Sequence, residues 1–192
     1  MESTIDLVCN KLNRFVFALK RLRQTVSFDA ALMAYHGYVS SVLSYGLLLW
    51  GNSVDVDRAF KIKKKCIRAI CNAWSGDTCK PLFIKHNILP LPCMYIRDIC
   101  VFVKYHSEYW KKRSEVLLRK TRAKYMNLQY KPPARKDIYK KNSFNMCILL
   151  YNCLPERLRL LDDKSFKRRL SEWLLHHCFY SVREFINRTI DI

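Results

Sequence analysis

Apolar residues recur every three or four positions through three segments in the first half of the chain, which is the spacing of one face of an α-helix. The first segment ends at about Gln24, and the third covers 56–73. The second begins after Ser27, its apolar row runs up to Tyr45 and Gly46, and Gly51 and Asn52 are expected to end it. Ser27 is suited to cap a helix N-terminus. The three apolar faces consist of Val8, Leu12, Phe15, Leu19 and Leu22; of Leu32, Tyr35, Val39 and Leu43; and of Val56, Phe60, Ile67, Ile70 and Trp74. We predict three helices that pack by these faces.

The pattern changes after residue 75. Positions 76–92 form a connector with a short helix at 82–86, and Pro92 is well placed as the first residue of a fourth helix. The segment 99–103 is apolar on all sides, which fits either a buried helix or a strand. Near the end of the chain, Ser165 is the expected cap of a helix whose apolar face comprises Phe166, Leu170, Trp173 and Leu174.

Basic residues dominate 110–142, which we interpret as a basic linker. The chain has only 4 Gly and 6 Pro, so helices are favoured through most of its length. We predict a mainly α fold in three parts: a helical bundle at 1–109, the linker at 110–142, and a small helical C-terminal appendage at 143–192.

The charge is strongly unbalanced, with 35 Lys and Arg against 16 Asp and Glu among 192 residues and a formal net charge of +19. Such a field attracts polyanions, of which nucleic acid is the commonest. The longest apolar stretch, around 47–50, is far shorter than the roughly 20 residues that a membrane-spanning helix needs. We expect no membrane partner.

The nine cysteines are an odd number without paired spacing, and Glu2 and Asp6 follow Met1 where a secretory signal would be basic. Both observations favour an intracellular location, the nucleus or the cytoplasm, where thiols stay reduced.

Two helix faces combine cations in a way that suits phosphate contacts. On the first helix Lys11, Arg14 and Arg21 lie beside the apolar face, with Phe17 close to them on the outward side. An exposed aromatic beside arginines suits a nucleic-acid base or sugar. On the third helix a strip opposite the apolar face is formed by Lys61, Lys64, Lys65 and Arg68. These eight residues are the predicted nucleic-acid contacts. The alternative is a helical interaction module, whose basic faces bind an acidic protein or stay solvated.

Asp162 and Asp163 are the most tempting acidic pair, since adjacent aspartates occur in the metal-binding turn of polymerases. A two-metal site needs them on a hairpin between apolar strands with a further carboxylate nearby. Here Lys164 and Lys167 follow instead, and a helix start explains the pair, because carboxylates there favour the helix dipole. We expect no catalytic residue.

The cysteines and histidines also lack the spacing of a metal site. Cys66, Cys71, Cys79 and His86 are too far apart for a compact zinc knuckle, and His176, His177 and Cys178 point in different directions on a helix. Phosphate-binding glycine loops and hydrolase motifs are absent from the sequence. We expect neither a metal nor a cofactor.

The segment from Tyr45 to Gly51 resembles the Tyr-Gly-x-x-x-Trp-Gly segment of jockey-type non-LTR (LINE-like) retrotransposon reverse transcriptases. Further similarities follow in the family's order over nearly the whole chain, at 12–23, 60–70, 79–83, 88–95, 151–155 and 179–185. The last two resemble the family's Tyr-Asn-x-Leu-Pro and Tyr-Ser-Val-x-Glu-Phe. At Lys63 the family tends to have Gln, and an amine in the apolar arc must reach solvent or find a partner.

The resemblance implies the thumb and C-terminal region of an RNA-directed DNA polymerase, downstream of the palm. The bundle at 1–109 would then be thumb-like, and the catalytic aspartates of the palm would precede Met1. The expected molecule is a non-catalytic fragment whose partners are RNA or an RNA/DNA hybrid, the template and primer, and the palm domain of an intact reverse transcriptase.

Overall fold

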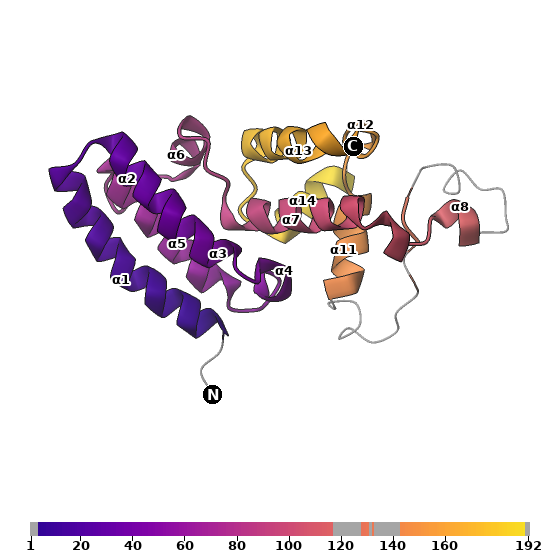
Figure 1. Cartoon of the computed structure of the whole chain (residues 1–192), viewed down its shortest axis with the longest axis horizontal. Helices are drawn as coiled ribbons and strands as arrows, with labels where there is room; N and C mark the ends of the chain where they lie inside the picture. The colour runs from indigo at the N-terminus through magenta and orange to yellow at the C-terminus, as the bar shows by residue number, and fades with distance from the viewer. Residues whose placement is uncertain (1–3, 117–127, 131, 133–142, 191–192) are drawn as a thin grey trace.

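The two longest helices of the N-terminal half, α1 (Thr4–Thr25) and α5 (Val56–Cys71), pack along each other (Figure 1). The computed structural model describes residues 4–116, 128–130, 132 and 143–190. Within these ranges the chain forms helices and one isolated β-bridge, so the predicted mainly α fold is confirmed. The apolar face predicted for the first helix is the buried one, with Val8, Leu12 and Leu19 in the core.

The second predicted helix begins after Ser27 as expected, but it ends before Gly46 and not at Gly51 and Asn52, so the predicted end is wrong. Ser27 caps α2 (Phe28–Ala34) by accepting a hydrogen bond from the Ala30 amide at 3.3 Å. The helix continues through a π-helical segment (Tyr35–Ser40) into α3 (Ser41–Ser44). Gly46 follows at φ +62°, a left-handed conformation that glycine adopts without strain, and it stops the helix.

A tight corner follows Gly46. In α4 (Leu47–Trp50) the buried Trp50 indole donates from Nε1 to the Tyr45 carbonyl oxygen at 2.9 Å. Gly51 lies so close to the Tyr95 ring and the Leu47 carbonyl oxygen that a β-carbon would overlap both. The backbone conformation of this corner therefore depends on Gly46, Trp50 and Gly51.

The prediction for the end of the third helix is wrong at Trp74. Asn72 adopts a left-handed conformation (φ 51°), which ends α5 at Cys71 and turns the chain away from the core. Trp74 follows this cap and is 80% exposed. Its backbone amide donates to the Asp77 carboxylate at 2.7 Å, which holds the loop after the helix.

Helix α7 (Leu91–Tyr105) is the centre of the second half, and α6 (Lys80–Lys85) precedes it. The helix begins at Leu91, one residue before Pro92, which was predicted as its first residue, and 99–103 is helical. Helices α11 (Ser143–Asn152), α13 (Asp163–His177) and α14 (Val182–Ile190) all contact α7, and α12 (Glu156–Arg159) contacts α13. Figure 1 shows α13 running beside α7 while α11 crosses it. The expected boundary at residue 109 thus separates α7 from the helices that cover it.

The first residues of the expected basic linker are packed against the helices. Trp110 is buried between Phe102 and Phe144, and α8 (Arg113–Val116) follows a 3-10 turn at Ser107–Tyr109. Lys112 and Gln129 form an antiparallel bridge, and the Asn152 side chain pairs with both backbone groups of Gln129 at 2.9 Å. The rest of the expected linker, 117–127, 131 and 133–142, lies outside the described residues.

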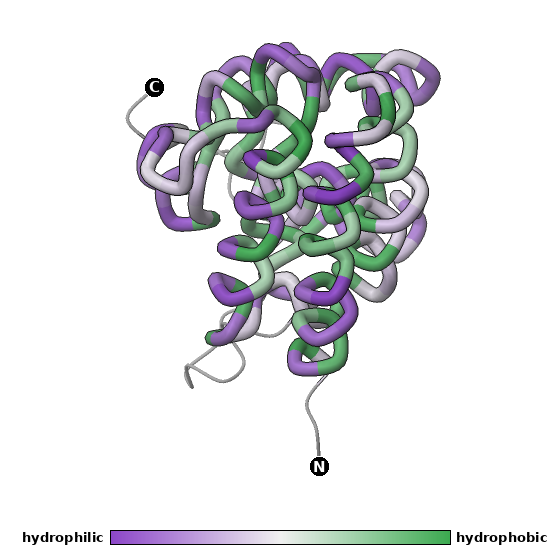
Figure 2. Tube along the Cα trace, turned by 90° about the vertical axis from the view of Figure 1, so that its left-hand side faces the viewer, coloured by the Kyte–Doolittle hydropathy of each residue, from purple (hydrophilic) through white to green (hydrophobic). Residues whose placement is uncertain are grey.

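Hydrophobic and hydrophilic residues alternate along the helices in Figure 2, as expected when each helix buries one face. In the described part of the chain, no helix combines the length and the apolar character needed to cross a bilayer.

Candidate nucleic-acid interface

A groove of about 700 Å³ runs between α1 and α5, and three of the predicted contact residues line it. Phe17 comes from α1, and Lys65 and Arg68 come from α5. The groove also contains Lys20, a cation that the sequence interpretation did not select. Packing of α1 against α5 brings these residues together, since they lie more than forty positions apart in the chain.

Phe17 is the aromatic element of this groove. Its side chain is 62% exposed, and the guanidinium carbon of Arg21 lies 4.8 Å from the centre of its ring. The predicted pairing of an exposed aromatic with an arginine is therefore present. An aromatic face in water beside cations can stack on a base, because every base has a π-face.

Arg68 is held at the rim of the groove by the loop after α5. Its Nε and Nη2 atoms donate to the Asp77 carbonyl oxygen at 3.0 and 2.7 Å. These bonds fix the guanidinium without neutralising it, because the acceptor is a carbonyl. The exposed Trp74 stands in the same loop, next to Ala73 and Ser75, which line the groove. Trp74 is thus a second aromatic candidate, which sequence periodicity had assigned to the core.

The other predicted cations lie outside the groove. Lys64 lies over two aromatic rings, with Nζ 4.7 Å from the centre of the Phe60 ring and 5.4 Å from that of Tyr180. Lys61 is exposed on α5, and Lys11 and Arg14 are exposed on α1. These residues add to the field around the groove but do not line it.

Lys63 points into the core and is 1% exposed. Its amine donates to the Met94 sulfur of α7 at 2.7 Å, so it has found a partner, although a thioether is a weak acceptor. Burial, followed by the nearby Arg97 guanidinium, lowers the pKa of Lys63 to about 7. Lys63 is a core residue and takes no part in the groove.

The aspartate pair begins a helix, as the sequence interpretation proposed, but the cap itself is Asp162 and not Ser165. The Asp162 carboxylate accepts from the Ser165 amide at 3.1 Å, and Asp163 lies in the first turn of α13. Hydrogen bonds from the Ser165 side chain and amide lower the pKa of Asp162. Ser165 already lies inside the helix, so the N-cap is Asp162, three residues before the predicted position.

The other tempting side chains have structural roles. Cys178 is buried and ends α13 in a left-handed conformation (φ 50°). The ring of His86 packs on Phe28, with 4.5 Å between ring centres. The residues that the structure describes contain no group of three or more His, Cys, Asp or Glu side chains that could hold a metal ion.

Comparison of the chain with protein-family models, with curated proteins and with solved structures gives no match.

Proposed function

We propose that this chain is a non-catalytic, thumb-like region of a non-LTR retrotransposon reverse transcriptase, and that it binds an RNA/DNA hybrid or RNA through the groove between α1 and α5. The ordered similarities along the chain support the family. The observation that carries the binding role is that packing of two helices brings Phe17, Lys20, Lys65 and Arg68 to one groove.

Binding in this groove is expected to depend on charge and shape and to be insensitive to base sequence. Lysine and arginine side chains contact phosphates, which are the same at every step of a nucleic acid. The exposed Phe17 ring adds a sequence-tolerant contact with an unpaired or terminal base. The affinity should therefore fall steeply as salt is added.

The test is the salt dependence of binding to an RNA/DNA hybrid, measured by fluorescence anisotropy. Each lost phosphate contact lowers the magnitude of the slope of log affinity against log salt by about 0.9 on B-form duplex and about 0.7 on single strands. The double variant Lys20→Gln/Lys65→Gln should therefore flatten the slope by about 1.4–1.8 on a hybrid. Glutamine is nearly as good a helix former as lysine, so the helix content should stay.

The matched control is Lys11→Gln/Arg14→Gln, which removes two exposed cations from α1 outside the groove. We expect it to flatten the slope by less than half as much. Equal losses in the two variants would mean that only bulk charge matters. The alternative, a module that binds an acidic protein, predicts in addition that heparin competes as well as the hybrid does.

The proposal places the protein in the nucleus or the cytoplasm. None of the nine cysteines, all of which the structure describes, forms a disulfide, and seven of them are buried. Burial raises the pKa of Cys66 and of Cys93 to about 12, so these thiols stay protonated and unreactive at neutral pH. When the protein is isolated from cells without reductant and denatured, we expect thiol titration to count nine thiols. A lower count, which would indicate disulfides, would contradict the intracellular location.

A further inference from the structure

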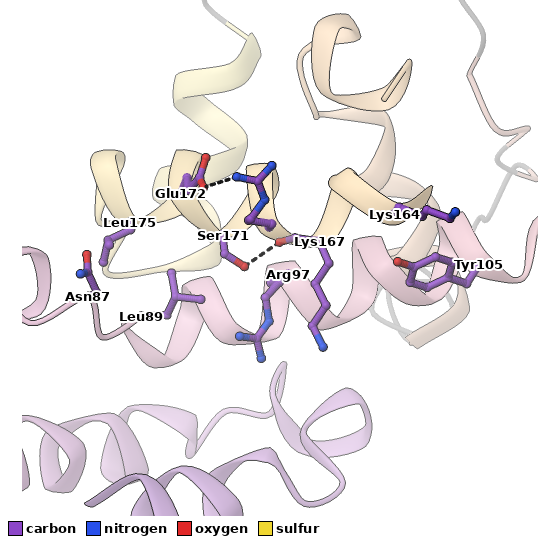
Figure 3. A pocket seen from close by; sticks show the side chains of 10 residues that line it. Asn87, Leu89, Arg97, Tyr105, Lys164, Lys167, Ser171, Glu172 and Leu175 are labelled. Atoms are coloured by element: carbon purple, nitrogen blue, oxygen red, sulfur yellow. Dashed lines mark hydrogen bonds and ion pairs between the residues drawn. The ribbon is translucent and has the colours of Figure 1, made fainter. Parts of the chain in front are cut away.

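A second basic groove lies between α7 and α13, and it contains none of the predicted contact residues. Its volume is about 730 Å³. Four cations line it, Arg97 from α7 and Lys164, Lys167 and Arg168 from α13, together with one carboxylate, that of Glu172. Figure 3 shows the Arg97 and Lys167 side chains extending in the same direction.

The carboxylate does not neutralise the groove. Glu172 is shared between Arg168, at 3.6 Å, and Arg169, at 3.4 Å. Asp98 balances Arg97, with 2.7 Å between Nη2 and Oδ1, and both side chains are less than a quarter exposed. Lys164 and Lys167 are exposed, and no carboxylate of the described residues lies within 4.0 Å of either amine. Two unpaired ammonium groups therefore face solvent beside two paired guanidinium groups.

The arrangement suits a ligand with repeating phosphates better than a single anion. Lys164 and Lys167 are three positions apart, and Arg168 and Ser171 continue the same row, so the row follows α13 over successive turns of about 5.4 Å. Arg97 of α7 extends alongside Lys167, so cations from both helices line the groove.

We propose that the groove between α7 and α13 is a second phosphate-binding groove, which contacts the backbone of the same nucleic acid that the α1–α5 groove binds. The inference rests on the proposed function for the identity of the ligand. A nucleic acid that binds both grooves must be longer than one that binds the α1–α5 groove alone, because it must reach from the N-terminal helices to α13.

Packing of α7 against both halves of the chain allows one nucleic acid to contact both grooves. Lys63 of α5 contacts Met94 of α7, and Cys93 of α7 donates to the Leu174 carbonyl oxygen of α13 at 3.7 Å, so helices of both grooves share one core. Two grooves on one rigid core keep a fixed separation. A nucleic acid that reaches both then gains the second contact without a further loss of rotational freedom.

The experiment compares two charge-removing variants and their combination on an RNA/DNA hybrid of about two helical turns, or about 20 base pairs. Lys164→Gln/Lys167→Gln changes the α7–α13 groove without breaking an ion pair, and Lys20→Gln/Lys65→Gln changes the α1–α5 groove. The matched control is Arg183→Gln/Arg188→Gln, which removes two exposed cations of α14 that do not line either groove.

The expected result is that each groove variant flattens the salt slope by about 1.4–1.8, that the combined variant loses the sum, and that the α14 control changes the slope by less than half as much. If Lys164→Gln/Lys167→Gln keeps the full slope while Lys20→Gln/Lys65→Gln flattens it, the second groove is refuted and the proposed function stands. If neither variant changes the slope, the proposed function fails as well.

A second arm distinguishes nucleic acid from an anionic membrane surface. Vesicles of phosphatidylserine and phosphatidylcholine replace the hybrid, and sedimentation measures bound protein. Should the Lys164/Lys167 variant lose vesicle binding but keep its slope on the hybrid, the groove binds lipid headgroups and the inference is overturned. Loss on the hybrid, together with vesicle binding that matches the α14 control, supports it.

Discussion

Replacing Lys63 with methionine should stabilise the protein, and the gain should shrink as the pH rises. The side chain lies in the core between α5 and α7, with its amine on the Met94 sulfur. Methionine keeps an unbranched chain of similar length and removes the amine, so the packing is largely preserved. After burial, the Arg97 guanidinium of α7 lowers the pKa of the amine, while the thiols of Cys93 and Cys66 and, more weakly, the Asp98 carboxylate raise it.

The magnitude follows from the pKa of the buried amine. Burial, followed by Arg97, lowers it from 10.5 to about 7 in the folded protein. Below pH 7 the amine is charged in both states, and the folded state carries the full cost of a buried charge, which is about 5 kcal/mol at about 1.4 kcal/mol for each pH unit. Between pH 7 and pH 10.5 the unfolded chain holds a proton that the folded chain lacks, so stability rises with pH.

The assay is chemical denaturation of the wild type and of Lys63→Met at pH 6 and pH 9, in reductant, followed by circular dichroism. The gain in free energy of unfolding should fall by about 2–3 kcal/mol between the two pH values. Cys66 and Cys93, the thiols coupled to Lys63, have pKa values raised to about 12 by burial, so both stay protonated in the folded protein at pH 6 and pH 9. Lys61→Met, an exposed position on the same helix, should change stability by less than about 0.5 kcal/mol at either pH. An equal gain at both pH values, or a loss at pH 6, would refute the reasoning.

Four further outcomes are expected. The pKa of His36, which burial and then Lys63 lower, should rise in Lys63→Met, as a nuclear magnetic resonance titration would show. Gly51→Ala should destabilise by about 2–3 kcal/mol because the new methyl overlaps the Tyr95 ring, while Gly46→Ala should cost about 1 kcal/mol through its left-handed backbone, both measured by denaturation. Phe17→Ala and Phe17→Leu should both weaken hybrid binding by about 1–3 kcal/mol if the ring stacks on a base, since leucine has no π-face, and should leave unfolding unchanged. Asp162→Ala should lower the melting temperature at pH 7 but not at a pH below the pKa of its carboxyl, because a protonated carboxyl no longer caps α13 as an anion.

Local patterns were sufficient to predict the apolar face of α1 and the Ser27 cap, because each is decided by neighbouring residues. The end of the second helix was predicted too late, at Gly51 and Asn52, because the apolar run 47–50 continues past the left-handed Gly46 that stops the helix. Periodicity failed at Trp74 because the left-handed Asn72 ended the helix before the next apolar position. No spacing rule marks that residue, since asparagine also occurs inside helices.

The candidate grooves were only partly predictable because each one requires the packing of two helices. Phe17, Lys65 and Arg68 were found from their own helix faces. Lys20 was missed because the flank of α1 that faces α5 is not known until the two helices are docked, although Lys20 lies three positions after Phe17 on that flank. Arg97 was missed for a stronger reason, since the other cations that line its groove lie about seventy positions later in the chain.

The central position of α7 bears on how this sequence tolerates a premature stop codon. Ile99, Cys100 and Val103 are completely buried, and contacts of α7 with α11, α13 and α14 cover that half of the chain. A polypeptide that stopped after residue 109 would keep every residue of the α1–α5 groove, yet it would leave the core face of α7 in water, where an apolar surface of that kind favours aggregation. A nonsense codon directly after residue 109 should therefore abolish binding by a groove whose lining residues all precede it.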